Sequence, residues 1–122
     1  MSDKLVLLAD VVQSRRIENR ERFSKRLQDT FGEVNAAEQK WLDVPLTTMK
    51  GVDEFGCVLT HRAPLPDVIV PLQRAAHPFG IRIGLATGEI DVGHGSETVA
   101  KMDGPAFHDA SALLEELREG LV

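Results

Sequence analysis

Apolar residues in the first half of the chain follow patterns that predict one buried strand, one long helix and a hairpin. The run KLVLLADVV (residues 4–12) is apolar apart from its first residue and one acid near its end, which is typical of a strand buried on both faces and central in its sheet. From Ile17 to Trp41 apolar residues recur at a spacing of three or four, which predicts an amphipathic helix. Pro45 is expected to end this helical structure, and the chain then enters an antiparallel hairpin whose return strand is GCVLTHR (56–62).

The second half of the chain adds a helix, a strand and a final helix. Val68, Leu72 and Ala76 have the spacing of a helix of about three turns, in which Pro71 should belong to the first turn. The alternating run IRIGLATGEI (81–90) predicts a strand, and the glycine-bearing DVGHGSETV that follows predicts a loop. A last helix is expected to start at GPA and to stop at a glycine. Its inward-facing residues are expected to be Phe107, Ala110, Leu113, Leu114 and Leu117.

The order of these elements predicts the fold class. The order β-α-β-β-α-β followed by a helix is that of an α+β, ferredoxin-like βαββαβ domain with an additional C-terminal helix, and we expect one domain over residues 1–122. This topology should bring the end of the first strand, at Asp10, close to the hairpin tip with its two acids, Asp53 and Glu54.

Three carboxylates gathered at one place need an explanation. Two like charges a few Å apart repel by on the order of 4 kcal/mol at an effective dielectric constant of 20. A divalent ion such as Mg²⁺ or Mn²⁺ would relieve this repulsion, because hard cations take carboxylate and phosphate oxygens as ligands. The alternative is that Asp10 only ends its strand and that the two hairpin acids lie on a solvated turn.

Composition narrows the classes of function. A net charge of −5 disfavours general nucleic-acid binding, although residues 14–26 hold six of the 14 Lys and Arg residues. That basic segment is either a solvated helix face or a contact for phosphate or an acidic partner. The single cysteine, Cys57, excludes an intrachain disulfide, and the chain has no stretch suited to spanning a membrane, so we expect a cytoplasmic protein.

Several ordered blocks resemble the SatD family. LLADVVQSRRIENR (7–20) resembles the opening of that family, VDEFGCVL (52–59) its Gly-Asp-Glu-Phe hairpin, IRIGLATGEI its glycine-rich fourth strand, and DGPAFHDASALLEEL (103–117) its Gly-Pro-Ala helix start. The blocks occur in family order and span nearly the whole chain.

The same blocks are similar to class III nucleotidyl cyclases and GGDEF diguanylate cyclases, which share a palm domain. This resemblance implies that Asp10 is a metal ligand and that Asp53, with Glu54 second, is a ligand or supports one. It also implies that Ser14, Arg15 and Lys50 contact phosphate or base.

Two departures from the cyclase pattern predict a degenerate catalytic site. Val52 stands where the related motifs carry a glycine, and its branched Cβ restricts close approach of the backbone to a nucleotide. The last helix offers His108, Asp109 and Ser111 where a cyclase carries an asparagine and an arginine, and no arginine follows until Arg118. We therefore leave the catalytic residues unassigned, and count His108 and Asp109 as candidate ligand-binding residues.

Three functions are compatible with these observations. The first is a cyclase-like domain that binds a divalent metal with a nucleotide or another phosphorylated ligand. The alternative is a non-catalytic module for regulation or protein interaction, and a homodimer is expected in either case. The third, association with nucleic acid through residues 14–26, predicts a steep salt dependence of binding.

Overall fold

The computed structural model describes residues 4–50, 53–60, 62–89, 91–92 and 102–120. Its elements are β1 (Lys4–Val11), the 3-10 turn η1 (Ser14–Arg16), α1 (Arg20–Ala37), the 3-10 turn η2 (Gln39–Trp41), β2 (Leu42–Lys50), β3 (Glu54–Thr60), α2 (Leu65–Ala76), β4 (Ile81–Gly88), β5 (Asp91–Val92), β6 (Met102–Asp103) and α3 (Pro105–Arg118).

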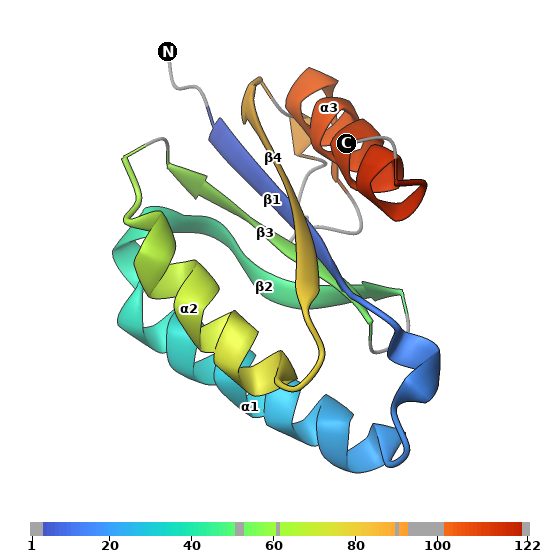
Figure 1. Cartoon of the computed structure of the whole chain (residues 1–122). Helices are drawn as coiled ribbons and strands as arrows, with labels where there is room; N and C mark the ends of the chain where they lie inside the picture. Colours follow the sequence, from blue (N-terminus) through green and yellow to red (C-terminus); the bar gives the residue numbers. More distant parts are fainter. Residues whose placement is uncertain (1–3, 51–52, 61, 90, 93–101, 121–122) are drawn as a thin grey trace.

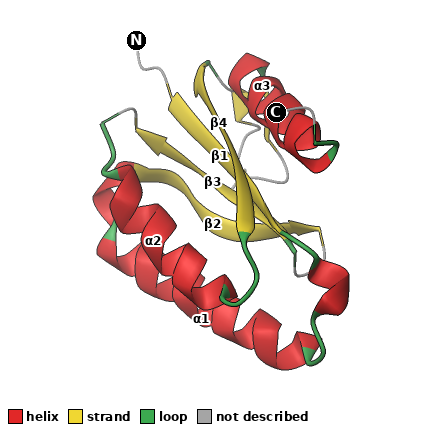
Figure 2. Cartoon of the chain, in the orientation of Figure 1, coloured by secondary structure: helices red, strands yellow, loops and turns green. Residues whose placement is uncertain are grey.

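The main sheet has four strands in the order β2-β3-β1-β4, and β1 pairs antiparallel with both β3 and β4. The predicted α+β, ferredoxin-like arrangement is therefore confirmed, with β1 in the interior of the sheet. Figure 1 shows α1 and α2 on one face of this sheet and α3 on the other, and Figure 2 shows the same division by element type.

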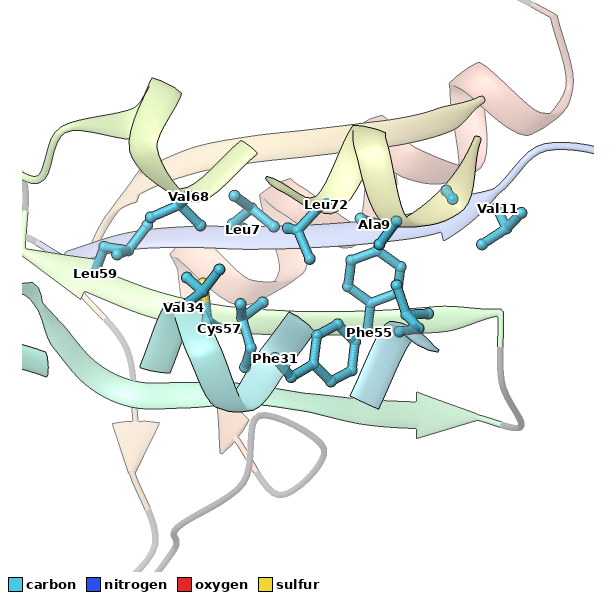
Figure 3. Packing of buried hydrophobic residues seen from close by; sticks show 14 of the residues in the cluster. Leu7, Ala9, Val11, Phe31, Val34, Phe55, Cys57, Leu59, Val68 and Leu72 are labelled. Carbon is cyan, nitrogen blue, oxygen red and sulfur yellow. The ribbon is translucent and has the colours of Figure 1, made fainter. Parts of the chain in front are cut away.

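Alternation along β1 divides its side chains between the two faces. Leu5, Leu7, Ala9 and Val11 belong to the core beneath α1 and α2, where Figure 3 shows several of them. Val6 and Leu8 belong to a second cluster under α3. Because side chains two residues apart share a face, Asp10 follows Val6 and Leu8 onto the α3 face. This placement decides which helix can contact the Asp10 carboxylate.

Aromatic packing anchors α1 on the larger core. The ring of Phe31 in α1 lies 5.1 Å from that of Phe55 in β3, and Figure 3 shows both rings among aliphatic side chains. The predicted small apolar role of Cys57 fits its burial in the same cluster. Burial raises the pKa of the Cys57 thiol to about 12, so this side chain is a neutral core group.

In the second cluster, under α3, the helix contributes mainly small residues to a sheet face of valine and leucine. Ala106, Ala110 and Leu114 are the buried residues of α3. At Gly84 in β4, a Cβ atom would lie only 2.5 Å from the backbone oxygen of Ala110. The helix backbone therefore lies directly on β4, at a distance that only glycine permits.

Pro45, Pro71 and Leu113 lie in different places from those predicted. Pro45 lies inside β2 rather than ahead of it, which is possible because β2 is an edge strand and its pairing with β3 shifts register between Val44 and Thr47. Pro71 lies in the interior of α2, not in its first turn. Burial of the apolar face of α2 offsets the hydrogen bond that Pro71 cannot donate. Leu113 is 40% exposed instead of facing inward.

The first helix is shorter than predicted, because α1 ends at Ala37 and Trp41 belongs to the separate 3-10 turn η2. Part of the predicted loop forms a short ladder in which β5 pairs with β6. Val52 and residues 93–99 of that loop lie outside the described residues.

Candidate functional site

Asp10 is the single buried charged residue in the described part of the chain, at 5% exposure. It lies at the end of β1, directly opposite Glu54 on β3 and Arg82 on β4. The sheet register thus places a second carboxylate and a guanidinium on either side of the Asp10 carboxylate. A buried carboxylate is costly unless it is paired, so its partners determine what this place can do.

Both carboxylate oxygens of Asp10 have arginine partners. Arg82 Nε donates to Oδ1 at 2.9 Å, and Arg118 Nε, at the end of α3, donates to Oδ2 at 2.5 Å. The two arginine side chains are 29% and 30% exposed, whereas the Asp10 side chain is 7% exposed. One buried anion is therefore held between two partly solvated cations.

Arg118 also connects Asp10 to the hairpin. Its Nη2 lies 3.2 Å from Glu54 Oε2, and its Nη1 lies 3.1 Å from Glu115 Oε2 on the same helix. Burial lowers the pKa of Arg118, but the hydrogen bond with Asp10 and the charges of Asp10 and Glu54 outweigh it and raise that pKa above its usual value. The guanidinium is therefore permanently charged. We call the set Asp10, Glu54, Arg82 and Arg118 the arginine corner.

Asp53 is directed to a different partner. Its Oδ2 accepts a hydrogen bond from Ser14 Oγ at 2.8 Å, and its backbone oxygen accepts one from Val11 N at 2.9 Å. These two bonds tie the hairpin to the turn after β1, where Gln13 has a left-handed backbone with φ of 58°. Of the two hairpin acids, Glu54 is the one that shares a cation with Asp10, while Asp53 holds η1 in place.

The remaining predicted ligand-binding residues are spread out. Arg15 is exposed on η1. The backbone of Lys50 pairs with Glu54, but the Lys50 side chain lies outside the described part of the structure. His108 and Asp109 are exposed near the start of α3, and about 15 Å of helix axis separates His108 from Arg118. The structure does not bring His108 and Asp109 to the arginine corner.

Sequence reasoning did not assign a site role to the two arginines that hold Asp10. Arg82 has a recognisable signal, because it is the only charged residue of a largely apolar strand that the predicted topology places beside β1. Arg118 has a weaker signal, because its position depends on which sheet face α3 covers. Nothing in the sequence pattern of α3 alone indicates that face.

The donor set can be tested against a divalent cation. In the described residues, no three His, Cys, Asp or Glu side chains lie together in an arrangement that could hold a metal ion. Asp10 and Glu54 are nevertheless two hard oxygen donors on neighbouring strands, which suits Mg²⁺ when phosphate oxygens and water complete the shell. These two residues fit such an ion in type, provided that Arg118 is exchanged for it.

Comparisons with known proteins agree with this architecture. A solved structure of a bacterial light-regulated adenylyl cyclase superimposes with a TM-score of 0.62 at 19% sequence identity. The match covers 97% of this chain and 41% of that cyclase, so the chain spans less than half the length of the cyclase and the likeness is one of fold. No curated protein matches the chain. Across the described helices, none has the length and hydrophobicity needed to cross a membrane.

A family comparison covers almost the entire sequence. The model of the SatD family matches residues 4–119, which include the four-stranded sheet, the arginine corner and helices α1, α2 and α3. The chain therefore belongs to the SatD family.

Proposed function

We propose that this SatD-family chain is a cyclase-like domain that binds a divalent cation, Mg²⁺ or Mn²⁺, together with a nucleotide or another phosphorylated ligand at Asp10 and Glu54. Arg118 is the resident cation of this site in the ligand-free state. The observation that carries the proposal is the Arg118 guanidinium, which lies between two carboxylates from neighbouring strands. Turnover is not part of the proposal, because the sequence departs from the cyclase pattern in its last helix.

Charge balance supports an exchange of cations. The Cβ atoms of directly paired residues in an antiparallel sheet are about 5 Å apart, and at a similar separation the carboxylates of Asp10 and Glu54 would repel by about 3 kcal/mol at an effective dielectric constant of 20. Arg118 offsets this repulsion with one positive charge. A divalent ion that arrives with phosphate oxygens supplies the same compensation.

The position of Arg118 at the end of α3 means that its release requires little free energy. The buried anchors of α3 end at Leu114, one helical turn before Arg118, which is the last residue of the helix. Helix ends fray at low cost, and the Arg118 side chain is already 30% exposed. The guanidinium can therefore leave the carboxylates while the rest of α3 stays packed on β4.

Thermal melting and calorimetry with Mn²⁺ and a nonhydrolysable GTP or ATP analogue test the proposal. We expect the cation and nucleotide together to raise the melting midpoint of the wild type, and Glu54→Gln or Asp10→Asn to remove that rise. Arg118→Gln should bind the cation at least about fivefold more tightly, because its competitor is gone. Glu115→Gln is the matched control, since Glu115 contacts Arg118 from the solvent side and should leave affinity unchanged. A rise that survives in both carboxylate variants would refute the assignment.

A non-catalytic homodimeric module is the second candidate. Its lack of a metal site is favoured by the arginine hydrogen bonds to both Asp10 oxygens and by the position of α3 over that sheet face, and the homodimer stays a prediction. In that case neither Mn²⁺ nor nucleotide would change the melting midpoint of any variant. Light scattering would give the mass of two chains, and substitution of the half-buried Phe79 or Trp41 would lower it.

A further inference from the structure

A second charged feature lies on the opposite side of the sheet from the arginine corner. A cavity of about 400 Å³ opens between the start of α1 and the loop from α2 to β4, two segments that Figure 1 shows side by side. Its walls include Arg16, Arg22 and Arg26, with Phe79 and Pro78. We call this cavity the basic cleft.

In the described part of the chain, none of the three arginines of the basic cleft forms an ion pair with a carboxylate. Arg26 is fixed by neutral groups, because its Nε donates to the Ala75 backbone oxygen at 2.7 Å and its Nη2 to the His77 backbone oxygen at 3.3 Å. The Arg26 guanidinium also lies 5.4 Å from the centre of the Phe23 ring. Arg16 and Arg22 are exposed, and in the described part of the chain neither side chain has a carboxylate partner.

The charge of the basic cleft is opposite to that of the protein. The chain carries −5 overall, but three arginines and one acid, Glu18, line the cavity, which leaves +2. A phosphate monoester carries about −1.5 to −2 at neutral pH, and arginine binds its oxygens in pairs. The size of the cavity is also in the range of small-molecule sites, which starts at about 300 Å³.

From this combination we propose that the basic cleft binds a small phosphate monoester, with the phosphate on Arg16 and Arg22 and the organic part against Phe79 and Pro78. The apolar wall is held in place, because the rings of Phe23 and Phe79 meet edge to face at 5.9 Å. The positive N-terminal end of α1, where Asn19 caps the Arg22 amide, adds to the attraction. This site does not depend on the arginine corner, because Asp10 faces α3 whereas Phe23 and Phe79 pack beneath α1 and α2.

The test is calorimetric titration with phenyl phosphate in EDTA, so that no divalent ion can bring the ligand to Asp10. Phenyl phosphate should bind at least about fivefold more tightly than inorganic phosphate, because its ring packs on Phe79, and phenol should not bind measurably. Arg16→Gln and Arg22→Gln should each weaken binding at least about fivefold. Arg15→Gln is the matched control, because Arg15 is also an exposed arginine on η1 but does not line the cavity.

Three outcomes would overturn the proposal. Equal weakening by Arg15→Gln and Arg22→Gln would mean only diffuse attraction to the basic segment. Loss of binding in Asp10→Asn, with the cleft variants unaffected, would place the phosphate at the arginine corner. A single-stranded oligonucleotide that binds more tightly than phenyl phosphate through the same arginines, with a steep salt dependence, would assign the cleft to nucleic acid.

Discussion

Replacing the partly buried Arg118 with glutamine should destabilise the ligand-free protein more than the same change at any exposed arginine. The change removes the guanidinium from Asp10 and Glu54 and leaves an uncharged polar side chain that is two bonds shorter. A hydrogen bond between charged groups contributes about 1.5–3 kcal/mol, and the uncovered repulsion between Asp10 and Glu54 is about 3 kcal/mol at an effective dielectric constant of 20. Arg82 still neutralises Asp10, and water reaches the partly exposed site, so these figures are upper limits.

We therefore expect Arg118→Gln to lower the free energy of unfolding by about 2–3 kcal/mol, a large part of the total stability of a small domain. Urea denaturation followed by the fluorescence of Trp41, the single tryptophan, measures this difference. Glu115→Gln removes another partner of the Arg118 guanidinium. Because the Glu115 side chain is 56% exposed, this change should lower the free energy of unfolding by less than about 0.5 kcal/mol.

The double variant Arg118→Gln with Glu54→Gln separates repulsion from lost hydrogen bonding. If the two carboxylates repel once Arg118 is gone, removal of the Glu54 charge should restore about 1–2 kcal/mol of the loss. Strict additivity of the two substitutions would show that Glu54 and Asp10 do not share the guanidinium in solution. Equal stability of the Arg118→Gln and Glu115→Gln proteins would refute the description of the arginine corner as a whole.

Four further substitutions test the packing of the fold and the ionisation of Cys57. Gly84→Ala should lower the free energy of unfolding by about 2–3 kcal/mol, because the new methyl group collides with the Ala110 backbone. Gly32→Ala, where α1 leaves open space, should raise it by about 0.5–1 kcal/mol. Urea denaturation of the two variants measures both changes. Cys57 should resist alkylation in the folded protein. Because the pKa of its thiol rises from 9.0 to about 12 on folding, only the unfolded chain loses the thiol proton between these pH values. The free energy of unfolding should therefore fall by up to about 1.4 kcal/mol per pH unit in that range, and Cys57→Ala should remove this slope. Asn35→Ala should lower the free energy of unfolding by about 1–3 kcal/mol in the same melts. The Asn35 side chain accepts from the Leu46 backbone N–H at 2.8 Å and donates to the Leu46 backbone oxygen at 3.2 Å. A change below about 0.5 kcal/mol would contradict this prediction.

The fold was predictable because its signals are periodic and local. The apolar run of β1, the short hairpin separation and the two helical patterns allow essentially one topology under the rules for right-handed crossovers. The errors fell on residues whose behaviour depends on tertiary position. Pro45 is tolerated because β2 is an edge strand, and Pro71 because the burial of α2 outweighs one missing hydrogen bond, and neither condition can be read from the neighbouring residues.

The site was predictable only in its acidic half. Topology was sufficient to bring Asp10 beside the hairpin, but the choice between adjacent acids needed the exact register, in which Asp10 pairs with Glu54 while Asp53 reaches Ser14. A shift of one residue in the pairing of two strands moves every side chain to the other face of the sheet. The sequence alone therefore did not decide which of the two hairpin acids pairs with Asp10.

Arg118, the cation that joins Asp10 and Glu54, comes from the last helix, where the sequence departs from the cyclase pattern. Arg118 lies ten residues beyond His108, about 15 Å further along the helix, and so cannot replace an arginine expected near the start of α3. Its role arises because Gly84 lets α3 lie close on β4, which carries the end of the helix to the Asp10 face of β1. A substitution that lifts α3, such as Gly84→Ala, should therefore act on Asp10 from a distance. If the proposed exchange of cations is correct, the same substitution that weakens the fold should strengthen Mn²⁺ binding, a combination that a purely structural ion pair would not produce.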